Sequence, residues 1–427
     1  MSIICGSDLS AASTGALAVS RALAAQRGDR EVVLVHVVDG EVDDATLVEL
    51  RAQLDAQIAA SATYGNTPEV RAEVVGGVAV DTLVGLAETE GSDLIVIAAH
   101  SRREHILAYL GTVAAAVIAR THVPVIAVRD PAPWLAFARG DRPLKILLGV
   151  DESTTCDLGI QWTLELGKRG PIEVVLGAIY YPDEAAAHYG LPARALVETD
   201  PEIERLMQRD LLRRFHGLAA PPGPTVTARA RRGLGRIGDH MIELANEEHV
   251  DAIVVGTSQK TGLGRLGSVS SVIVQDAPES VVCVPPQAVV AHSGTVPVLR
   301  QALVATDLSP FANRAVPYAF ALTRPDGEVH LVHVIKEDAE LDEAALARQL
   351  AELAPTGATQ RAHTHIVRGD DTSAALAQCA ARYGVDVICI ASHGRAGITR
   401  ALVGSVADQL LRETRVPVLV LRPASPP

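Results

Sequence analysis

The sequence contains few aromatic residues, few lysines and no excess of positive charge. Aromatic residues make up 3% of the 427 residues, only four of the 38 basic residues are lysine, and the formal net charge is −13. Proteins that bind nucleic acid need basic patches, and those that bind single strands also need aromatic stacking platforms. We therefore expect no nucleic-acid partner.

Long hydrophobic runs and cysteine motifs are also missing. No apolar run reaches the ~20 residues that a membrane helix needs, and the opening MSIICGSDLS lacks the features of a signal peptide. Because the cysteines form no CxxC pair, we expect buried, reduced thiols at Cys5, Cys156, Cys283, Cys379 and Cys389. These features predict a cytoplasmic protein with no membrane partner.

One pattern of strands and helices occurs three times. Each third begins with an apolar strand followed by Asp-x-Ser, in IICGSDLS, ILLGVDES and LVATDLS, and Ser10, Ser153 and Ser309 are typical helix N-caps. The second strands are nearly continuous apolar runs, as expected for parallel strands buried on both faces. The order predicts an α/β protein of three tandem doubly wound, Rossmann-like domains, each with a five-stranded parallel sheet.

Two Pro/Gly-rich stretches, 130–143 and 285–297, are the predicted linkers between these domains. At ~150 residues per domain, the length also suggests three domains. The predicted domains are 1–130, 144–285 and 298–423.

A loop of small and basic residues follows the fourth strand of each third. In the last third it reads ASHGRAGITRALVGSV from Ala391. A glycine-bearing loop before a helix N-terminus presents several N–H groups to one point, which suits a phosphate. Gly394 would let the backbone approach an anion, and Ser405 would cap the helix or hold a metal-bound phosphate. Many such loops only turn the chain, so the motif alone leaves a structural role open.

The strand-one Asp, LVHV in the second strand, this loop and VPVLVL in the fifth strand together resemble the universal stress protein family. ATP-binding members of that family carry GxxG, nine residues, and Gly-Ser or Gly-Thr. The resemblance implies an adenine-nucleotide alpha-hydrolase-like fold and an ATP site, with Mg as an accompanying ion, in the third domain. The implied site comprises Asp307, Val334 and Ile335 for adenine and ribose, and Ala391, His393, Gly394, Arg395, Gly404 and Ser405 for the phosphates.

Each third departs from the family pattern in its own way. Ala391 stands in place of the first glycine and would cost ~1 kcal/mol if that position required positive φ. The first domain has Ala98 and Ser101 in place of both glycines, so its phosphate loop is degenerate. The second domain has a shortened loop, and its corresponding site residues are Asp151, Gly256, Gly267 and Ser268.

Two polar clusters have both a functional and a structural interpretation. The run RARRGLGR from Arg229 could meet an anion, or it could be a solvated charge run. His363 and His365 would share one strand face, but no carboxylate or cysteine accompanies the histidines at a ligand spacing, so we predict no metal site. The histidines of this third are His330, His333, His363, His365 and His393.

The second domain carries an insertion at 180–200 that contains Tyr180, Tyr181, Asp183, His188 and Tyr189. It leaves the sheet where the strands end, so it could be a ligand lid or could supply an acid or base. The alternative is a clip that covers apolar surface. No triad or carboxylate pair stands out, so catalytic residues stay unassigned.

Three functions remain open: a non-catalytic stress or regulatory protein that binds ATP through the third domain, a nucleotide-free interaction scaffold, and an enzyme that acts on a nucleotide or another phosphorylated small molecule. At most weak ATP hydrolysis is expected. The resemblance also implies that fifth strands pair antiparallel. The first two can pair within the chain, which leaves Val416–Leu421 of the third domain to join a homodimer.

Overall fold

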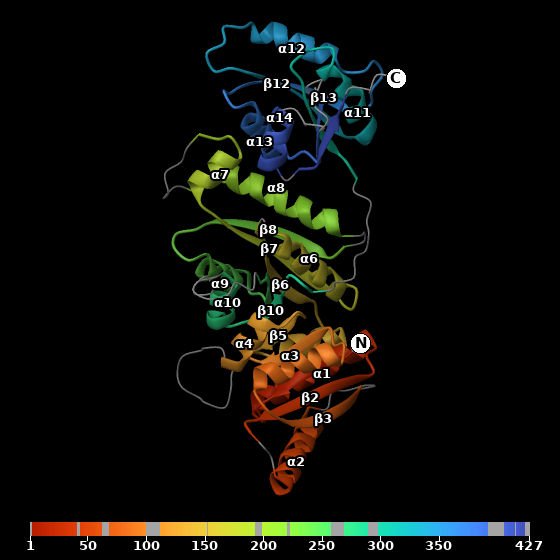
Figure 1. Cartoon of the computed structure of the whole chain (residues 1–427), viewed down its shortest axis with the longest axis vertical. Coiled ribbons are helices and arrows are strands. Elements are labelled where there is room, and N and C mark those ends of the chain that lie inside the picture. The colour runs from red at the N-terminus through yellow and green to blue at the C-terminus, as the bar shows by residue number, and fades with distance from the viewer. Residues whose placement is uncertain are drawn as a thin grey trace, which may run out of the picture. The chain divides into compact units, whose positions relative to one another are not determined.

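The computed structural model describes residues 2–40, 43–61, 68–99, 112–151, 153–192, 199–219, 223–257, 269–288, 298–391, 405–414 and 416–422. Its helices and strands alternate along the chain (Figure 1), and three α/β repeats follow one another, as predicted. The chain divides into two compact units, unit 1 with residues 1–180 and 211–295 and unit 2 with residues 181–210 and 296–427.

The first repeat alternates five strands with four helices. They are β1 (Ile3–Ser7), α1 (Ala11–Arg27), β2 (Glu31–Val38), α2 (Asp44–Ala60), β3 (Glu69–Gly76), α3 (Ala79–Thr89), β4 (Leu94–Ala98), α4 (Thr112–Arg120) and β5 (Val125–Val128). Helix α1 begins as predicted, because the Ser10 hydroxyl accepts a hydrogen bond from the N–H of Ser13.

The second repeat follows a connecting helix, α5 (Ala132–Arg139). Its elements are β6 (Leu144–Gly149), α6 (Thr154–Gly167), β7 (Ile172–Tyr180), α7 (Pro182–His188), α8 (Pro201–Leu218), β8 (Thr225–Arg232), α9 (Ile237–Glu248), β9 (Ala252–Gly256), α10 (Val269–Asp276) and β10 (Ser280–Val284). The stretch 130–143, predicted as a linker, thus contains a helix that its Pro/Gly content did not indicate. Trp134 and Phe137 of α5 are fully buried, and this burial stabilises a helix where the Pro/Gly content indicated a loop.

The third repeat contains β11 (Gln301–Ala305), the 3-10 turn η2 (Ala312–Arg314), α11 (Ala315–Leu322), β12 (Glu328–Ile335), α12 (Glu343–Glu352), β13 (Arg361–Arg368), α13 (Thr372–Tyr383), β14 (Val387–Ala391), α14 (Ser405–Glu413) and β15 (Val418–Leu421). Its sheet has the order β13-β12-β11-β14-β15, and every neighbouring pair is parallel. Strand β15 forms one edge.

The first two repeats share a single ten-stranded sheet in the order β3-β2-β1-β4-β5-β10-β9-β6-β7-β8. Strands β5 and β10 pair antiparallel, with Ile126 opposite Val282. Both strands are buried along their whole length. The predicted pairing of the first two fifth strands is therefore confirmed.

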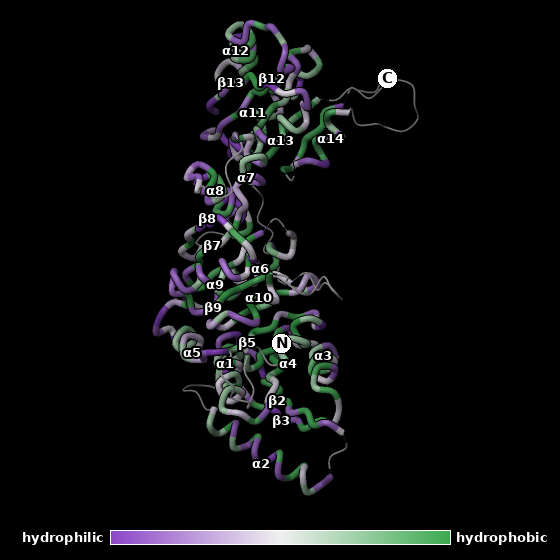
Figure 2. The backbone as a smooth tube through the Cα atoms, turned by 90° about the vertical axis from the view of Figure 1, so that its left-hand side faces the viewer, coloured by the Kyte–Doolittle hydropathy of each residue, from purple (hydrophilic) through white to green (hydrophobic). Residues whose placement is uncertain are grey.

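Apolar residues on both faces of the strands form the cores. One cluster extends across the first two repeats, and two further clusters lie in the third repeat, one containing residues of α11 and the other residues of α13 and α14. Helix α2 differs from these apolar core elements, because hydrophilic and hydrophobic residues alternate along it (Figure 2). Burial on both faces explains why the strands read as unbroken apolar runs.

The insertion of the second repeat belongs to unit 2, together with the third repeat. Pro182, Ala185, Ala186 and Tyr189 are buried. A Cβ added to Gly190 would lie 3.1 Å from Gln378 Oε1 of α13. These contacts place part of the insertion against α13, as expected for a clip, the second of the two predicted roles.

Arg209 of α8 completes the attachment of this clip. Its guanidinium donates to the carbonyl oxygens of Ala381 (2.5 Å) and Arg382 (2.6 Å) in the last turn of α13. Asp210 accepts from Arg209 Nε (2.8 Å) and from the Tyr189 hydroxyl (2.9 Å). A cation on the C-terminal carbonyls also complements the helix dipole of α13.

Candidate functional site

The turn after the first strand is built in the same way in all three repeats. The aspartate Oδ1 accepts the N–H of the serine two residues later, at 3.0 Å for Asp8, 2.8 Å for Asp151 and 2.9 Å for Asp307. This local bond holds the turn in front of the following helix. Asp307 therefore stabilises its own turn, while helix α11 begins only at Ala315.

The residue after the aspartate adopts an unusual backbone conformation in two repeats. Leu9 has φ 62° and Leu308 has φ 65°, in the left-handed region that disfavours leucine. A preceding hydroxyl stabilises this conformation, because the N–H of Leu308 donates to Thr306 Oγ1 (2.9 Å) and the N–H of Leu9 to Ser7 Oγ (3.0 Å). Two repeats therefore share one defined turn geometry.

A histidine of the second strand also binds this turn. His333 Nδ1 lies 2.8 Å from the carbonyl oxygen of Thr306, and His36 Nδ1 lies 2.8 Å from that of Ser7. This contact gives a physical reason for histidine in the LVHV motif.

Asp307 is exposed and ionised. Partial burial opposes ionisation, but hydrogen bonds from the Ser309 hydroxyl and backbone N–H groups, with the nearby His333, hold the pKa of Asp307 below its ordinary value. The turn therefore presents a carboxylate that can accept hydrogen bonds from a ligand.

Asp307, Val334, Ile335 and Ala391 lie at one end of three adjacent strands. Ala305 of β11 is in register with Val332 of β12 and with Ile390 of β14. The strand order reverses between β11 and β14, and ligands of doubly wound sheets bind outside the strand ends at such a point. Ser405 is the first residue of α14, as predicted.

Several predicted site residues lie outside the described residues. They are His393, Gly394, Arg395 and Gly404 of the third repeat and Gly267 and Ser268 of the second.

Ala391 carries none of the strain that the sequence suggested. It is the last residue of β14, in register with Leu421, and it has no positive φ. The condition under which alanine would be costly, a positive φ at this position, is therefore not met. At the corresponding position of the second repeat, glycine is needed for another reason, since a Cβ on Gly256 would lie 2.8 Å from the carbonyl oxygen of Thr155.

A side chain from a following helix occupies the aspartate turn in the first repeat. Gln57 of α2 is 6% exposed, and its amide donates to Ser13 Oγ (2.9 Å) and accepts from Ser7 Oγ (2.7 Å). Sequence reasoning missed Gln57, because nothing in α2 marks one glutamine as reaching across to the turn.

Arg214 of α8 plays the same part in the second repeat. It donates to the carbonyl oxygens of Asp151 and Ser153 and to Asp157 Oδ1 (2.7 Å). In the third repeat, the Thr306 hydroxyl donates to Asn313 Oδ1 of η2 (2.7 Å), and the N–H of Thr306 donates to the carbonyl oxygen of Val332 in β12 (3.1 Å). The side-chain hydrogen bond that the structure gives to Asp307 comes from Ser309.

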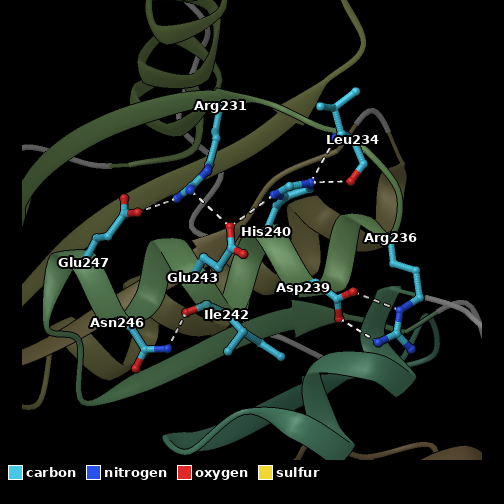
Figure 3. Close-up of polar contacts among 9 residues, drawn as sticks. All are labelled: Arg231, Leu234, Arg236, Asp239, His240, Ile242, Glu243, Asn246 and Glu247. Atoms are coloured by element: carbon cyan, nitrogen blue, oxygen red, sulfur yellow. Dashed lines mark hydrogen bonds and ion pairs between the residues drawn. The ribbon is translucent and has the colours of Figure 1, made fainter. Parts of the chain in front are cut away.

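Carboxylates of α9 pair with three arginines of RARRGLGR, Arg229, Arg231 and Arg236, and Figure 3 draws the last two. Arg231 lies 3.0 Å from Glu243 and 2.9 Å from Glu247, and Arg236 lies 2.9 Å from Asp239. Arg229 is likewise paired with Glu248 at 2.5 Å. These pairs favour the charge-run interpretation over an anion site.

The third-repeat histidines form a stack. His330, His363 and His365 share one face of the sheet with Tyr383 of α13, and the Tyr383 ring centroid lies 4.2 Å from that of His365 and 4.8 Å from that of His330. His330 Nδ1 is hydrogen-bonded to His365 Nε2 at 3.0 Å. Stacked rings do not converge on one ion, and the described residues contain no group of three or more ligands that could hold a metal.

Burial keeps two of these rings neutral, those of His330 and His365. Burial, aided by the two neighbouring histidines, lowers the pKa of His330 to about 3. Burial, with His363 and Arg382, lowers the pKa of His365 to about 4. Glu328 adds a contact that sequence spacing missed, since its Oε2 lies 3.2 Å from His363 Nε2.

All five cysteines are free and buried, as expected. Burial raises the pKa of Cys379 and of Cys389 to about 11, which keeps both thiols protonated. They are packing residues.

Comparison with known proteins agrees with the repeated architecture. The profile described as the universal stress protein family matches the chain three times, over residues 1–129, 144–285 and 299–422. The chain belongs to the universal stress protein family. Its three consecutive copies make it a tandem member, as the repeated motifs predicted.

Relatives in bacteria carry the same family name. A universal stress protein of Mycolicibacterium smegmatis is 26% identical over 301 residues, which cover 65% of this chain and 97% of that protein. A universal stress protein of Mycobacterium tuberculosis is 32% identical over 205 residues, which cover 43% of this chain and 64% of the relative.

Solved structures of universal stress proteins are also similar. One from Archaeoglobus fulgidus has a TM-score of 0.45 at 17% identity, and the match covers 66% of this chain and 97% of that one. Another, described as a complex with cAMP, has a TM-score of 0.26 at 21% identity, and the match covers 30% of this chain and 99% of that one.

None of the helices described for this chain is long and apolar enough to span a membrane.

Proposed function

We propose that this tandem universal stress protein binds ATP through its third repeat and acts as a non-catalytic stress or regulatory protein. The observation that carries the proposal is the exposed, ionised Asp307 at the point where the strand order reverses. Adenine and ribose would contact Asp307, Val334 and Ile335, whose carboxylate and apolar side chains suit a nucleoside.

The phosphates would lie between the end of β14 and the start of α14. Ala391 and Ser405 bound this stretch, and Gly394 and Gly404 have the family spacing within it. The N-terminus of α14 would favour a phosphate, and the Ser405 hydroxyl would reach a phosphate or its Mg ion. Gln57 and Arg214 fill the corresponding turns of the other repeats, which favours structural roles there.

Calorimetric titration of the full chain with ATP and Mg tests this assignment. Gly404→Val should abolish most binding, because a side chain would enter the N–H cradle, whereas the matched Gly111→Val in the first repeat should leave binding unchanged. Asp307→Ala should weaken binding tenfold or more while leaving the circular dichroism spectrum intact. Equal ATP affinity of Gly404→Val and the parent would refute the site, and a panel with cAMP and GTP would define the nucleotide.

We further propose a homodimer joined through the fifth strand of the third repeat. The counterparts β5 and β10 cover each other, but β15 lies at a sheet edge and is only half-buried along its length. Ile118, Val274 and Leu411 occupy one equivalent position, the seventh residue after the Gly-Thr or Gly-Ser glycine. The first two are 8% and 4% exposed, and Leu411 is 47% exposed.

The pairing of β5 with β10 within the chain suggests a second contact for the proposed dimer. Arg129, directly after β5, donates to the carbonyl oxygens of Val274 (3.1 Å) and Gln275 (3.2 Å) at the end of α10. Arg422 directly follows β15 and would make the same contact with α14 of a second copy.

Light scattering coupled to gel filtration tests the dimer. Leu411→Lys should give a monomer, because it places a charge in the apolar contact, while Leu341→Lys, at a residue 52% exposed elsewhere in the repeat, should stay dimeric. A parent that is monomeric at tens of micromolar would exclude the dimer.

The five free, buried cysteines are in keeping with a reducing cytoplasm, where we place the protein.

A further inference from the structure

Helix α11 of the third repeat presents an apolar outer face. Tyr318 is 49% exposed and Leu322 is 45% exposed, and Pro317 and Ala321 beside them are exposed as well. On a helix, positions four residues apart lie on one side, so these residues form a single face. We call it the α11 face, defined as Pro317, Tyr318, Ala321 and Leu322.

The same face exists in the first repeat, and there it is covered. Leu9 and Leu308 occupy the same left-handed position of the Asp-Leu-Ser turn, so counting forward from each aligns Val19 with Tyr318 and Leu23 with Leu322. Val19 is fully buried and Leu23 is 3% exposed. A position that is buried in one repeat and exposed in the other lacks its covering element.

Helix α5 is the covering element in the first repeat. It packs against α1, and its Trp134 and Phe137 are fully buried. Pro131, just before this helix, lies against Gly15, where an added Cβ would come within 3.2 Å of the proline ring. The cover is therefore a short apolar helix with two aromatic side chains three residues apart.

Among the described residues, helix α11 packs on η2 and on strands β11, β12 and β14, and its outer face stays exposed. Arg314 takes the place of Gly15 and is exposed. A covering helix with an acidic residue near its start, as Asp130 stands before α5, would complement this arginine.

We propose that the α11 face binds a short amphipathic helix of a protein partner, which presents two aromatic residues three apart behind an acidic N-terminus. The partner helix would cover Tyr318 and Leu322 in the way that α5 packs on α1 beside Gly15. An amphipathic helix that docks its apolar side, with aromatic anchors, on an apolar surface is a recurrent mode of peptide binding. It is independent of nucleotide binding and of the β15 dimer.

The chain itself supplies a probe. A fluorescein-labelled peptide of residues 129–142, which contains α5, is titrated into the full-length protein and followed by fluorescence anisotropy. Saturable binding is expected, and a control peptide with Trp134→Ala and Phe137→Ala should bind at least tenfold more weakly. Leu322→Lys in the protein should also weaken binding at least tenfold, while Leu341→Lys should bind like the parent.

Three results would overturn the proposal. The first is an absence of saturable binding up to millimolar protein, and the second is equal binding by the parent and Leu322→Lys, which would place the peptide elsewhere. The third is a lower oligomeric state of Leu322→Lys in the absence of peptide, because the face would then belong to a second copy of this chain.

Discussion

The histidine stack should make the third repeat sensitive to acid well above the pH at which carboxylates protonate. His330 is 6% exposed, and its Nε2 is buried without a hydrogen-bond partner in the described part of the chain. A proton added to His330 would leave a charged N–H in that position, beneath the Tyr383 ring. The folded repeat therefore resists a proton that the unfolded chain accepts freely.

The sign and size of this pH effect on stability follow from the coupling between proton binding and folding. The folded pKa of His330, about 3, lies below the ordinary 6.5, so the stabilisation is present above pH 6.5 and is lost as the pH falls toward 3. Between pH 7.5 and pH 4.5, this one residue should remove roughly 2–3 kcal/mol from the free energy of unfolding. His365 is only half-buried and should add about 1 kcal/mol after allowance for solvent screening.

Hydrogen exchange read by mass spectrometry can locate this loss. Peptides from β12 and β13, corrected for the intrinsic effect of pH, should lose protection between pH 7.5 and pH 4.5. Trp134 and Trp162 both lie in unit 1, so tryptophan fluorescence reports that unit separately. His330→Phe keeps an aromatic ring in the stack and should reduce the pH dependence by the contribution of one proton.

The substitution His122→Phe, at an exposed residue of the first repeat, is the matched control and should leave the pH profile of β12 and β13 unchanged. If His330→Phe and the parent lost protection over the same pH range by the same amount, the buried stack would not be the cause.

Three further outcomes test the packing. Gly256→Ala should destabilise unit 1 by about 1–3 kcal/mol in urea unfolding, because its Cβ would lie 2.8 Å from a carbonyl oxygen; an unchanged midpoint would mean that the chain relaxes around it. Trp134→Ala should cost about 3–5 kcal/mol in the same unit, measured by circular dichroism, whereas Val48→Ala, at a residue 69% exposed, should stay within about 0.5 kcal/mol. Arg209→Ala should lower the exchange protection of the last turn of α13 by about 1–2 kcal/mol, while the exposed Arg205→Ala should not.

The sequence predicted the repeated architecture because buried parallel strands leave a strong local signal. Continuous apolar runs such as those of β2 and β12 are required by burial on both faces, and Asp-x-Ser marks the helix that follows. The pairing of β5 with β10 followed from the family resemblance, and the burial of both strands agrees with the need of an apolar edge strand for a partner.

Other features depend on contacts between distant residues and leave no local pattern. Pro/Gly content indicated a linker where Trp134 and Phe137 stabilise a helix, because local propensity does not report tertiary packing. Gln57 and Arg214 reach the aspartate turns from helices whose sequences do not mark them. The missing glycine at Ala391 suggested strain, yet the backbone there is an ordinary strand end.

The clip formed by α7 and the start of α8 has a practical consequence for work with fragments. The family repeats end at residues 285 and 422, but the compact unit that contains the third repeat also includes residues 181–210. A fragment of residues 298–427 would lack Arg209 on the end of α13, and a fragment of residues 1–285 would separate α7 and Gly190 from α13. Dissection at the repeat boundaries would therefore break contacts within one compact unit, and the loss of ligand binding by either piece would say nothing about where the ligand binds.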